Sequence, residues 1–124
     1  MLTRMVVAVI DDEPLWLKTM GRVLAREGFG ALLLSDAAEA LARIPAERPS
    51  VAIIDGQMPG QSGVELARRL RATMGDECPT LLLVSGDPES LEGDRDLFAA
   101  VYRKPVPLEE LVSALRREAQ AASA

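Results

Sequence analysis

The sequence predicts a doubly wound α/β protein, in which helices cover both faces of a five-stranded parallel sheet. Five short apolar runs alternate with longer stretches of helical periodicity, as in consecutive βαβ units. The runs are nearly continuous in Val, Ile and Leu, which is typical of strands buried on both faces. They occupy residues 5–10, 31–34, 51–54, 81–84 and 101–102.

The composition excludes several classes of function. The 124 residues fit one domain, and the net charge of -5 disfavours binding to nucleic acid or to anionic membranes. The absence of histidine excludes serine triads and histidine metal sites. The chain has one cysteine, Cys78, so no intrachain disulfide can form, which fits a reducing compartment. We expect Cys78 to be a packing residue. The N-terminal apolar run is too short to span a membrane, so we expect a cytoplasmic protein.

The first two helices have clear predicted ends. Pro14 suits the first turn of a helix that Gly28 and Gly30 should end. Asp36 is the predicted N-cap of the second helix, which we expect Pro45 to stop.

The later helices differ in how strongly they are predicted. Ser62 with Glu65 has the spacing of a capping box, and the last helix should begin near Pro107. Arg68, Arg69 and Arg71 are read as the solvated face of the third helix. The segment 86–100 holds two glycines and a proline, so we expect a short or irregular fourth helix. The tail 118–124 should fray, leaving an ordered core of about 4–118 in a single domain, 1–124.

Four of the five predicted strands end in a chemically capable side chain. These side chains are Asp11, Asp12, Asp55, Ser85 and Lys104. A strand order of 2-1-3-4-5 would bring them to one edge of the sheet, where doubly wound proteins bind their ligands. Taken singly, the two neighbouring acids also fit an ordinary helix N-terminus, and Ser85 with Gly86 fits a simple turn.

The residue types at this edge predict phosphate chemistry. Carboxylates packed together repel one another unless a cation balances them, and Mg²⁺ prefers such oxygen ligands. A lysine and a serine hydroxyl beside the ion would bind phosphate oxygens. Asp55 is the best candidate for a nucleophile that forms an acyl phosphate, whereas Asp11 and Asp12 are better placed to hold the metal.

Four motifs carry a resemblance to a known family over about residues 4–118. They are "VIDDEP" at 9–14, "IIDGQMPGQSGVEL" at 53–66, "LLLVSGD" at 81–87 and "YRKPV" at 102–106. The sequence resembles the receiver domains of bacterial two-component response regulators, which have the flavodoxin-like, CheY-like fold. The resemblance implies that Asp55 is the phosphoacceptor for a sensor histidine kinase or a histidine phosphotransfer protein.

The resemblance also implies roles for the neighbours of Asp55. Asp12 would bind Mg²⁺ directly, Asp11 directly or through water, and the Gln57 backbone carbonyl would complete the protein ligands. Lys104 would pair with the phosphoryl oxygens, and Ser85 would hydrogen-bond to them on activation. The Lys104–Pro105 bond is similar to one that is usually cis in the family.

Some positions tune or alter the family pattern. Gln57, Gly86 and Asp87 flank the implied phosphate. The usual aromatic switch position holds Val101, and the aromatic residue, Tyr102, comes one position later. Because successive side chains of a strand point to opposite faces, Tyr102 should face the other layer and pack inward.

Three other functions compete with a phosphorylation switch. An aspartyl-phosphate phosphatase usually has a second acid two residues after the nucleophile, where this chain has Gln57. A flavodoxin-like cofactor carrier would need a Ser/Thr/Gly-rich loop after the first strand, in place of "DDEPLW". An inactive receiver would lack some of the phosphorylation residues. We therefore expect a signalling module, not an enzyme, that acts on a downstream protein target or an output domain and can form a homodimer on phosphorylation.

Overall fold

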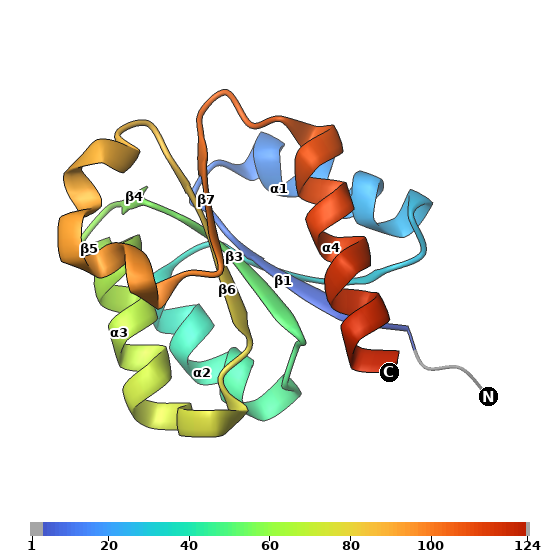
Figure 1. Cartoon of the computed structure of the whole chain (residues 1–124), viewed down its shortest axis with the longest axis horizontal. Coiled ribbons are helices and arrows are strands. Elements are labelled where there is room, and N and C mark those ends of the chain that lie inside the picture. The colour runs from blue at the N-terminus through green and yellow to red at the C-terminus, as the bar shows by residue number, and fades with distance from the viewer. Residues whose placement is uncertain (1–3, 124) are drawn as a thin grey trace.

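The computed structural model describes residues 4–123; residues 1–3 and 124 of the predicted single domain lie outside the described residues. Its centre is a five-stranded parallel sheet with the order β2-β1-β3-β6-β7 (Figure 1). The strands are β1 (Val6–Ile10), β2 (Gly30–Leu34), β3 (Val51–Asp55), β6 (Thr80–Ser85) and β7 (Ala100–Arg103). These are the five predicted strands in the predicted order, so the doubly wound fold is confirmed.

Helices form a layer on each face of the sheet (Figure 1). The helices α1 (Pro14–Arg26) and α4 (Leu108–Ser123) lie on one face. The other face carries α2 (Ala37–Glu47), α3 (Gly63–Met74) and the 3₁₀ segment η2 (Pro88–Leu97). Alternate residues of each strand point to opposite layers, and for this reason the central strands β1, β3 and β6 are apolar along most of their length.

The predicted starts of α1, α2 and α3 are confirmed. Pro14 is the first residue of α1, and the side chains of Asp36 and Ser62 accept hydrogen bonds from the Glu39 and Glu65 amides. Gly28, with φ of 88°, follows the end of α1, where a left-handed backbone favours glycine. Gly30 does not end the helix; it begins β2.

Pro45 does not stop α2, contrary to the prediction. The helix continues to Glu47 and ends at Arg48, which has φ of 52° and donates its backbone N–H to the Ile44 carbonyl. Proline removes one hydrogen bond from a helix. Here it lies in the last turn, and the fully buried Ile44 anchors that turn in the core.

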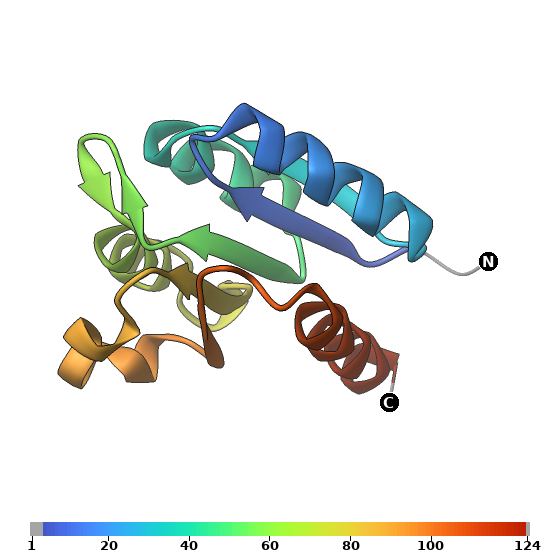
Figure 2. The ribbon, with the colours of Figure 1, turned by 90° about the horizontal axis from the view of Figure 1, so that it is seen from above.

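Two short elements follow β3 and α3. A hairpin of β4 (Gln57–Met58) and β5 (Gln61–Ser62) projects beyond the end of β3 (Figure 2). The 3₁₀ turn η1 (Gly75–Glu77) follows α3 and leads to Cys78. Cys78 packs half-buried against the core, and burial raises the pKa of its thiol, as befits a packing residue.

The last third of the chain contains one irregular and one regular helix. The prediction of a short, irregular fourth helix is confirmed by η2, which is interrupted at Glu92 with φ of 46° and ψ of −116°. In contrast, α4 is continuous to Ser123, beyond the expected end of the ordered core at about residue 118. Its alanine-rich tail has high helix propensity. Among residues 4–123, no helix has the length and hydropathy needed to cross a bilayer.

Candidate functional site

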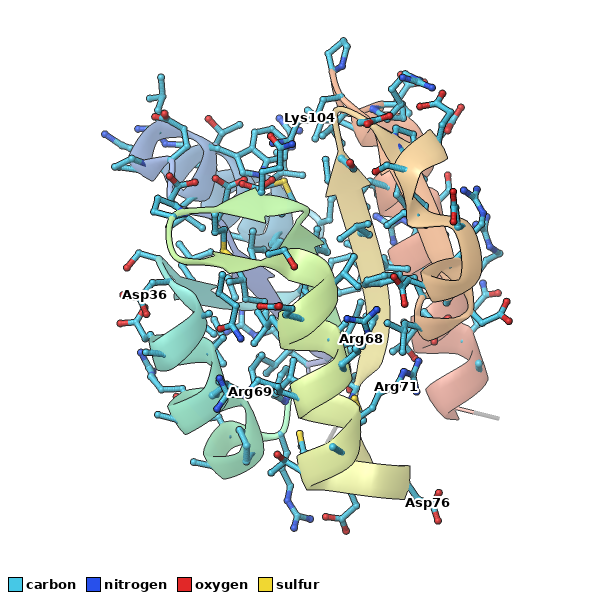
Figure 3. All side chains as sticks on the ribbon, turned by 90° about the vertical axis from the view of Figure 1, so that its left-hand side faces the viewer. Asp36, Arg68, Arg69, Arg71, Asp76 and Lys104 are labelled. Atoms are coloured by element: carbon cyan, nitrogen blue, oxygen red, sulfur yellow. The ribbon has the colours of Figure 1, made fainter. Side chains whose placement is uncertain are left out.

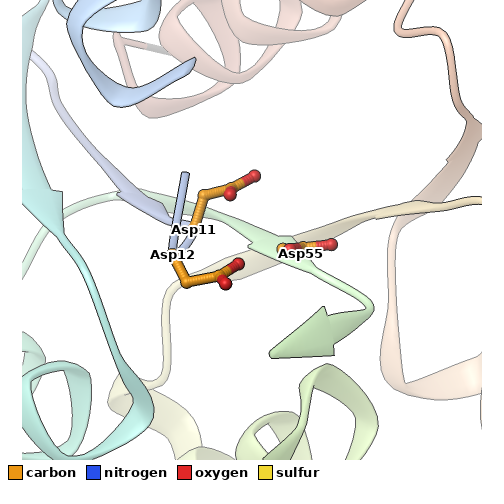
Figure 4. Close-up of side chains that lie close together, drawn as sticks. All are labelled: Asp11, Asp12 and Asp55. Carbon is orange, nitrogen blue, oxygen red and sulfur yellow. The ribbon is translucent and has the colours of Figure 1, made fainter. Parts of the chain in front are cut away.

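Three carboxylates meet at the carboxyl edge of the sheet (Figure 4). Asp11 and Asp12 follow β1, and Asp55 is the last residue of the neighbouring strand β3. One oxygen from each side chain lies within 4.8 Å of the others. Asp11 and Asp55 are 6% and 4% exposed, whereas Asp12 faces solvent. The edge thus holds two buried carboxylates beside one that solvent can reach.

Lys104 supplies the positive charge of this edge. Its Nζ donates a hydrogen bond of 2.8 Å to Asp55 Oδ1, and the Gln57 amide donates a second, of 3.2 Å, to the same oxygen. The Lys104 backbone amide donates to the Ser85 carbonyl, which fixes the start of the loop after β7. The Lys104–Pro105 peptide bond is cis, the isomer that the family resemblance implies.

The electrostatics of the cluster favour a bound cation. Burial raises the pKa of Asp11, and the charges of Asp55 and Asp12 raise it further. The Glu13 amide, at 2.9 Å from Asp11 Oδ1, and the Lys104 ammonium lower it. A divalent cation would relieve the repulsion among the three carboxylates, and their hard oxygen donors fit Mg²⁺.

Ser85 lies beside this cluster at the end of β6. Its side chain is buried, and its Oγ accepts a hydrogen bond of 3.0 Å from the Asp87 amide. Gly56 leaves space for it, because a Cβ on Gly56 would lie 3.2 Å from the Ser85 Cβ. Gly86 and Asp87 are exposed at the rim.

Gly63 contacts the site, and sequence reasoning missed it. A Cβ on Gly63 would lie 2.3 Å from the Asp55 backbone oxygen, closer than any side chain allows. The Gly63 amide also donates to the Gly56 carbonyl. Glycine at the first position of α3 therefore lets this helix begin directly against the end of β3. The sequence did hold one signal: the position after the Ser62 cap is a glycine, which is a poor helix former, where most helices would begin with a better one.

The two candidate switch residues of β7 face different layers. Val101 packs against the core beneath α2, α3 and η2. Tyr102 packs, half-buried, against the core beneath α1 and α4. The predicted change of face is therefore confirmed. Trp16 of α1 packs against the same core as Tyr102, in agreement with a role in helix packing.

Fold and site together define a class: a doubly wound α/β protein with an acidic, lysine-containing site at the carboxyl edge of its parallel sheet. The model of the response regulator receiver domain matches residues 7–116. The chain therefore belongs to the response regulator receiver domain family.

Curated relatives and solved structures agree with this assignment. Response regulator MprA of Mycobacterium tuberculosis (strain H37Rv) is 34% identical in an alignment of 115 positions that covers 89% of this chain and 48% of that protein. The chain thus spans about half the length of the curated relatives it matches.

Solved structures show the same fold over nearly the whole chain. A response regulator receiver protein from Pseudomonas putida is 27% identical, with a TM-score of 0.85 over 94% of this chain and 99% of that one. The response regulator TrrA from Thermotoga maritima, in complex with Mg²⁺-BeF, is 23% identical. Its TM-score is 0.82 over 92% of this chain and 98% of that one, and it supports the fold alone.

Proposed function

We propose that Asp55 reversibly accepts a phosphoryl group from a phosphohistidine, in a reaction that depends on Mg²⁺. The observation that carries this proposal is the convergence of Asp11, Asp12, Asp55 and Lys104 on one edge of the sheet. The donor would be a sensor histidine kinase or a histidine phosphotransfer protein. Receiver-family membership and the Mg²⁺-BeF complex of TrrA support this reading.

The chain's own residues suit an in-line transfer. A carboxylate oxygen of Asp55 attacks phosphorus, a new O–P bond forms, and the P–N bond to histidine breaks. When bound to Asp11, Asp12, Asp55 and the Gln57 carbonyl, Mg²⁺ would neutralise charge on the phosphoryl oxygens. Lys104 Nζ, which donates to Asp55, would donate to a phosphoryl oxygen as well. Hydrolysis of the acyl phosphate by water would reset the switch.

The residues around the acceptor would set the lifetime and the readout of the phosphate. The Ser85 hydroxyl would turn toward the phosphoryl oxygens, and Gln57, Gly86 and Asp87 would control the approach of water. The output would be a partner protein or a second domain, and phosphorylation would favour a homodimer. The length of the curated relatives supports an output domain in the same polypeptide. We place this phosphoacceptor in the cytoplasm, where the donor kinases act.

Acetyl phosphate with Mg²⁺, followed by intact-mass measurement, tests the proposal. The chain should gain one phosphate, and Asp55→Asn should gain none. Asp76→Asn is the matched control, because Asp76 is exposed at the opposite end of the molecule from Lys104 (Figure 3). Absence of any gain would favour an inactive receiver. Sustained turnover of a phosphate ester would favour a phosphatase.

A further inference from the structure

The helix α1 is basic along its exposed side, although the chain as a whole is acidic. Lys18, Arg22 and Arg26 follow one another at intervals of four residues, which places them on one stripe of the helix. All three are exposed, and α1 contains no acidic residue. Within residues 4–123, the side chains of Lys18 and Arg22 make no ion pair or hydrogen bond. Like charges at this spacing repel one another, so an opposite charge brought by a partner would stabilise the stripe.

The start of α4 presents the opposite charge on the neighbouring surface. Glu109 is exposed in the first turn, and its side chain has no ion pair or hydrogen bond in the part of the chain that the structure describes. A groove of about 300 Å³ runs between α1 and α4, and its apolar lining residues are Val23, Leu108 and Val112. Arg26 lines it from α1, and Glu109 lines it from α4. The face between the two helices therefore has a basic edge, an apolar centre and an acidic edge.

The groove is already held in shape within one chain. Arg116 of α4 pairs with Glu27, the residue after α1, and its guanidinium lies 6.0 Å from the centroid of the Phe29 ring. These contacts join α4 to the end of α1 beside the groove. Leu111 and Leu115 anchor the same helix in the core, where both are fully buried. A surface of fixed shape loses little conformational freedom when it is covered, which favours association.

The two edges of this face complement each other, which favours a second copy of the same chain as its partner. An acidic partner would bring a like charge to Glu109, and a basic partner would bring a like charge to Arg22. A two-fold axis, in contrast, places the same surface on both copies, so that α1 of each copy lies over the start of α4 of the other. Arg22 of each copy then meets Glu109 of the other, and the apolar centre is covered on both sides.

We propose that the face between α1 and α4 is the homodimer interface of this chain, with Arg22 of each copy paired to Glu109 of the other. The inference rests on the proposed function, in which phosphorylation favours a homodimer, and it supplies the surface that this dimer uses. Both helices begin close to the proposed site: α1 starts two residues after Asp12, and α4 starts four residues after Lys104. Phosphorylation of Asp55 therefore acts next to the starts of both helices that form the interface.

A charge-swap experiment, read by sedimentation equilibrium in Mg²⁺ and beryllofluoride, tests the interface. Arg22→Glu and Glu109→Arg, each alone, bring like charges together across the interface and should weaken dimerisation by about tenfold or more. An equimolar mixture of the two variants should form a heterodimer with the wild-type affinity, because both contacts between the copies are then attractive. Arg69→Glu is the matched control, since Arg69 is exposed on α3 in the other layer and the change in charge equals that of Arg22→Glu. It should dimerise like the wild type.

The outcomes separate the interface from the function on which it rests. A chain that intact mass shows to be phosphorylated, yet is monomeric at millimolar concentration, would overturn the interface. A mixture of the two variants that stays monomeric would overturn it as well. A dimer that Arg117→Glu dissociates and Arg22→Glu does not would place the second copy on the β7 side of α4 instead, because Arg117 lines a groove there with Tyr102. A chain that takes up no phosphate but forms the charge-swapped heterodimer would overturn the proposed function and leave the interface in place.

Discussion

The carboxyl edge of the sheet has two halves that are built differently. On the acceptor half, Asp11, Asp12 and Asp55 extend from two adjacent central strands whose register is fixed by the parallel ladder. On the reporter half, β6 leads into η2, a 3₁₀ segment fastened by exposed arginine contacts. The chemistry of the site depends on strand register, while the position of η2 depends on a few surface contacts. The two halves can therefore be changed separately.

The largest expected effect comes from Gly63→Ala on the acceptor half. The new Cβ would lie 2.3 Å from the Asp55 backbone oxygen, so the start of α3 or the end of β3 must shift. We expect a loss of about 1–3 kcal/mol of unfolding free energy and slower phosphorylation. Urea unfolding and intact mass after acetyl phosphate measure the two effects.

Gly93→Ala is the control for that substitution on the reporter half. No heavy atom lies within 4 Å of a Cβ built at Gly93. Its effect on stability should stay within about 0.5 kcal/mol, as for ordinary surface changes. If Gly63→Ala were equally mild, the close approach of α3 to Asp55 would not be what positions the acceptor.

Lys104→Gln should slow phosphorylation without removing the acceptor. Lys104 is the only cation that bonds to Asp55 among the described residues, and such a donor contributes about a hundredfold to the rate of charge-developing reactions. The initial rate of phosphate incorporation measures this loss. The Lys104→Gln substitution should lower the free energy of unfolding by at most about 1 kcal/mol, because the lysine side chain is 43% exposed.

Lys18→Gln serves as the matched variant, since Lys18 is the only other lysine and is exposed on α1. It should phosphorylate at the wild-type rate. Equal rates for Lys104→Gln and Lys18→Gln would contradict a role for Lys104 in the transfer.

The sequence predicted the acceptor half better than the reporter half, for a physical reason. Asp11, Asp55, Ser85 and Lys104 all lie at strand ends, and the order of parallel strands determines which strand ends meet. Contacts such as Arg68 with Asp94 join segments 26 residues apart and depend on the path of an irregular backbone. No periodicity records such a path, so the sequence predicted that the arginines are exposed, as they are, but not that two of them contact η2.

Two further differences came from packing. The sequence marked Pro45 as a helix stop, but a buried isoleucine outweighed one lost hydrogen bond. The closeness of Gly63 to Asp55 depends on the β4–β5 hairpin, which turns the chain back toward β3. Two-residue strands are too short to show in an apolar pattern.

Trp16 should report on the acceptor half alone. It follows Asp12 by about one helical turn and packs against the core beneath α1 and α4. Its fluorescence, the only tryptophan signal, should change when Mg²⁺ and beryllofluoride are added. The Arg68→Gln, Arg71→Gln double variant should show the same change, because Arg68 and Arg71 contact η2 on the other face of the sheet. An unchanged spectrum at saturating ligand would count against a position of Trp16 near the metal.

The smallest effect is the titration of Tyr102, the only tyrosine, which tests whether the two layers are independent. Burial raises the pKa of its phenol above 10.0; Glu110 adds to this, and Arg117 opposes it. The folded state thus binds the proton more tightly than the unfolded state. Tyr102 therefore contributes stability that is complete below the unfolded pKa and is lost as the pH rises through the higher, folded pKa.

Tyrosinate absorbance as a function of pH, in the native chain and in the chain in urea, measures how far the midpoint of the Tyr102 titration is raised. Arg117→Gln should raise this midpoint further, and Glu110→Gln should lower it. The Arg68→Gln, Arg71→Gln double variant should leave it where it is in the wild type, because Tyr102 packs against the α1 and α4 layer. A midpoint that shifted in the double variant would show that Tyr102 is coupled to the contacts of Arg68 and Arg71 with η2. The reporter half would then extend through β7 to both faces of the sheet.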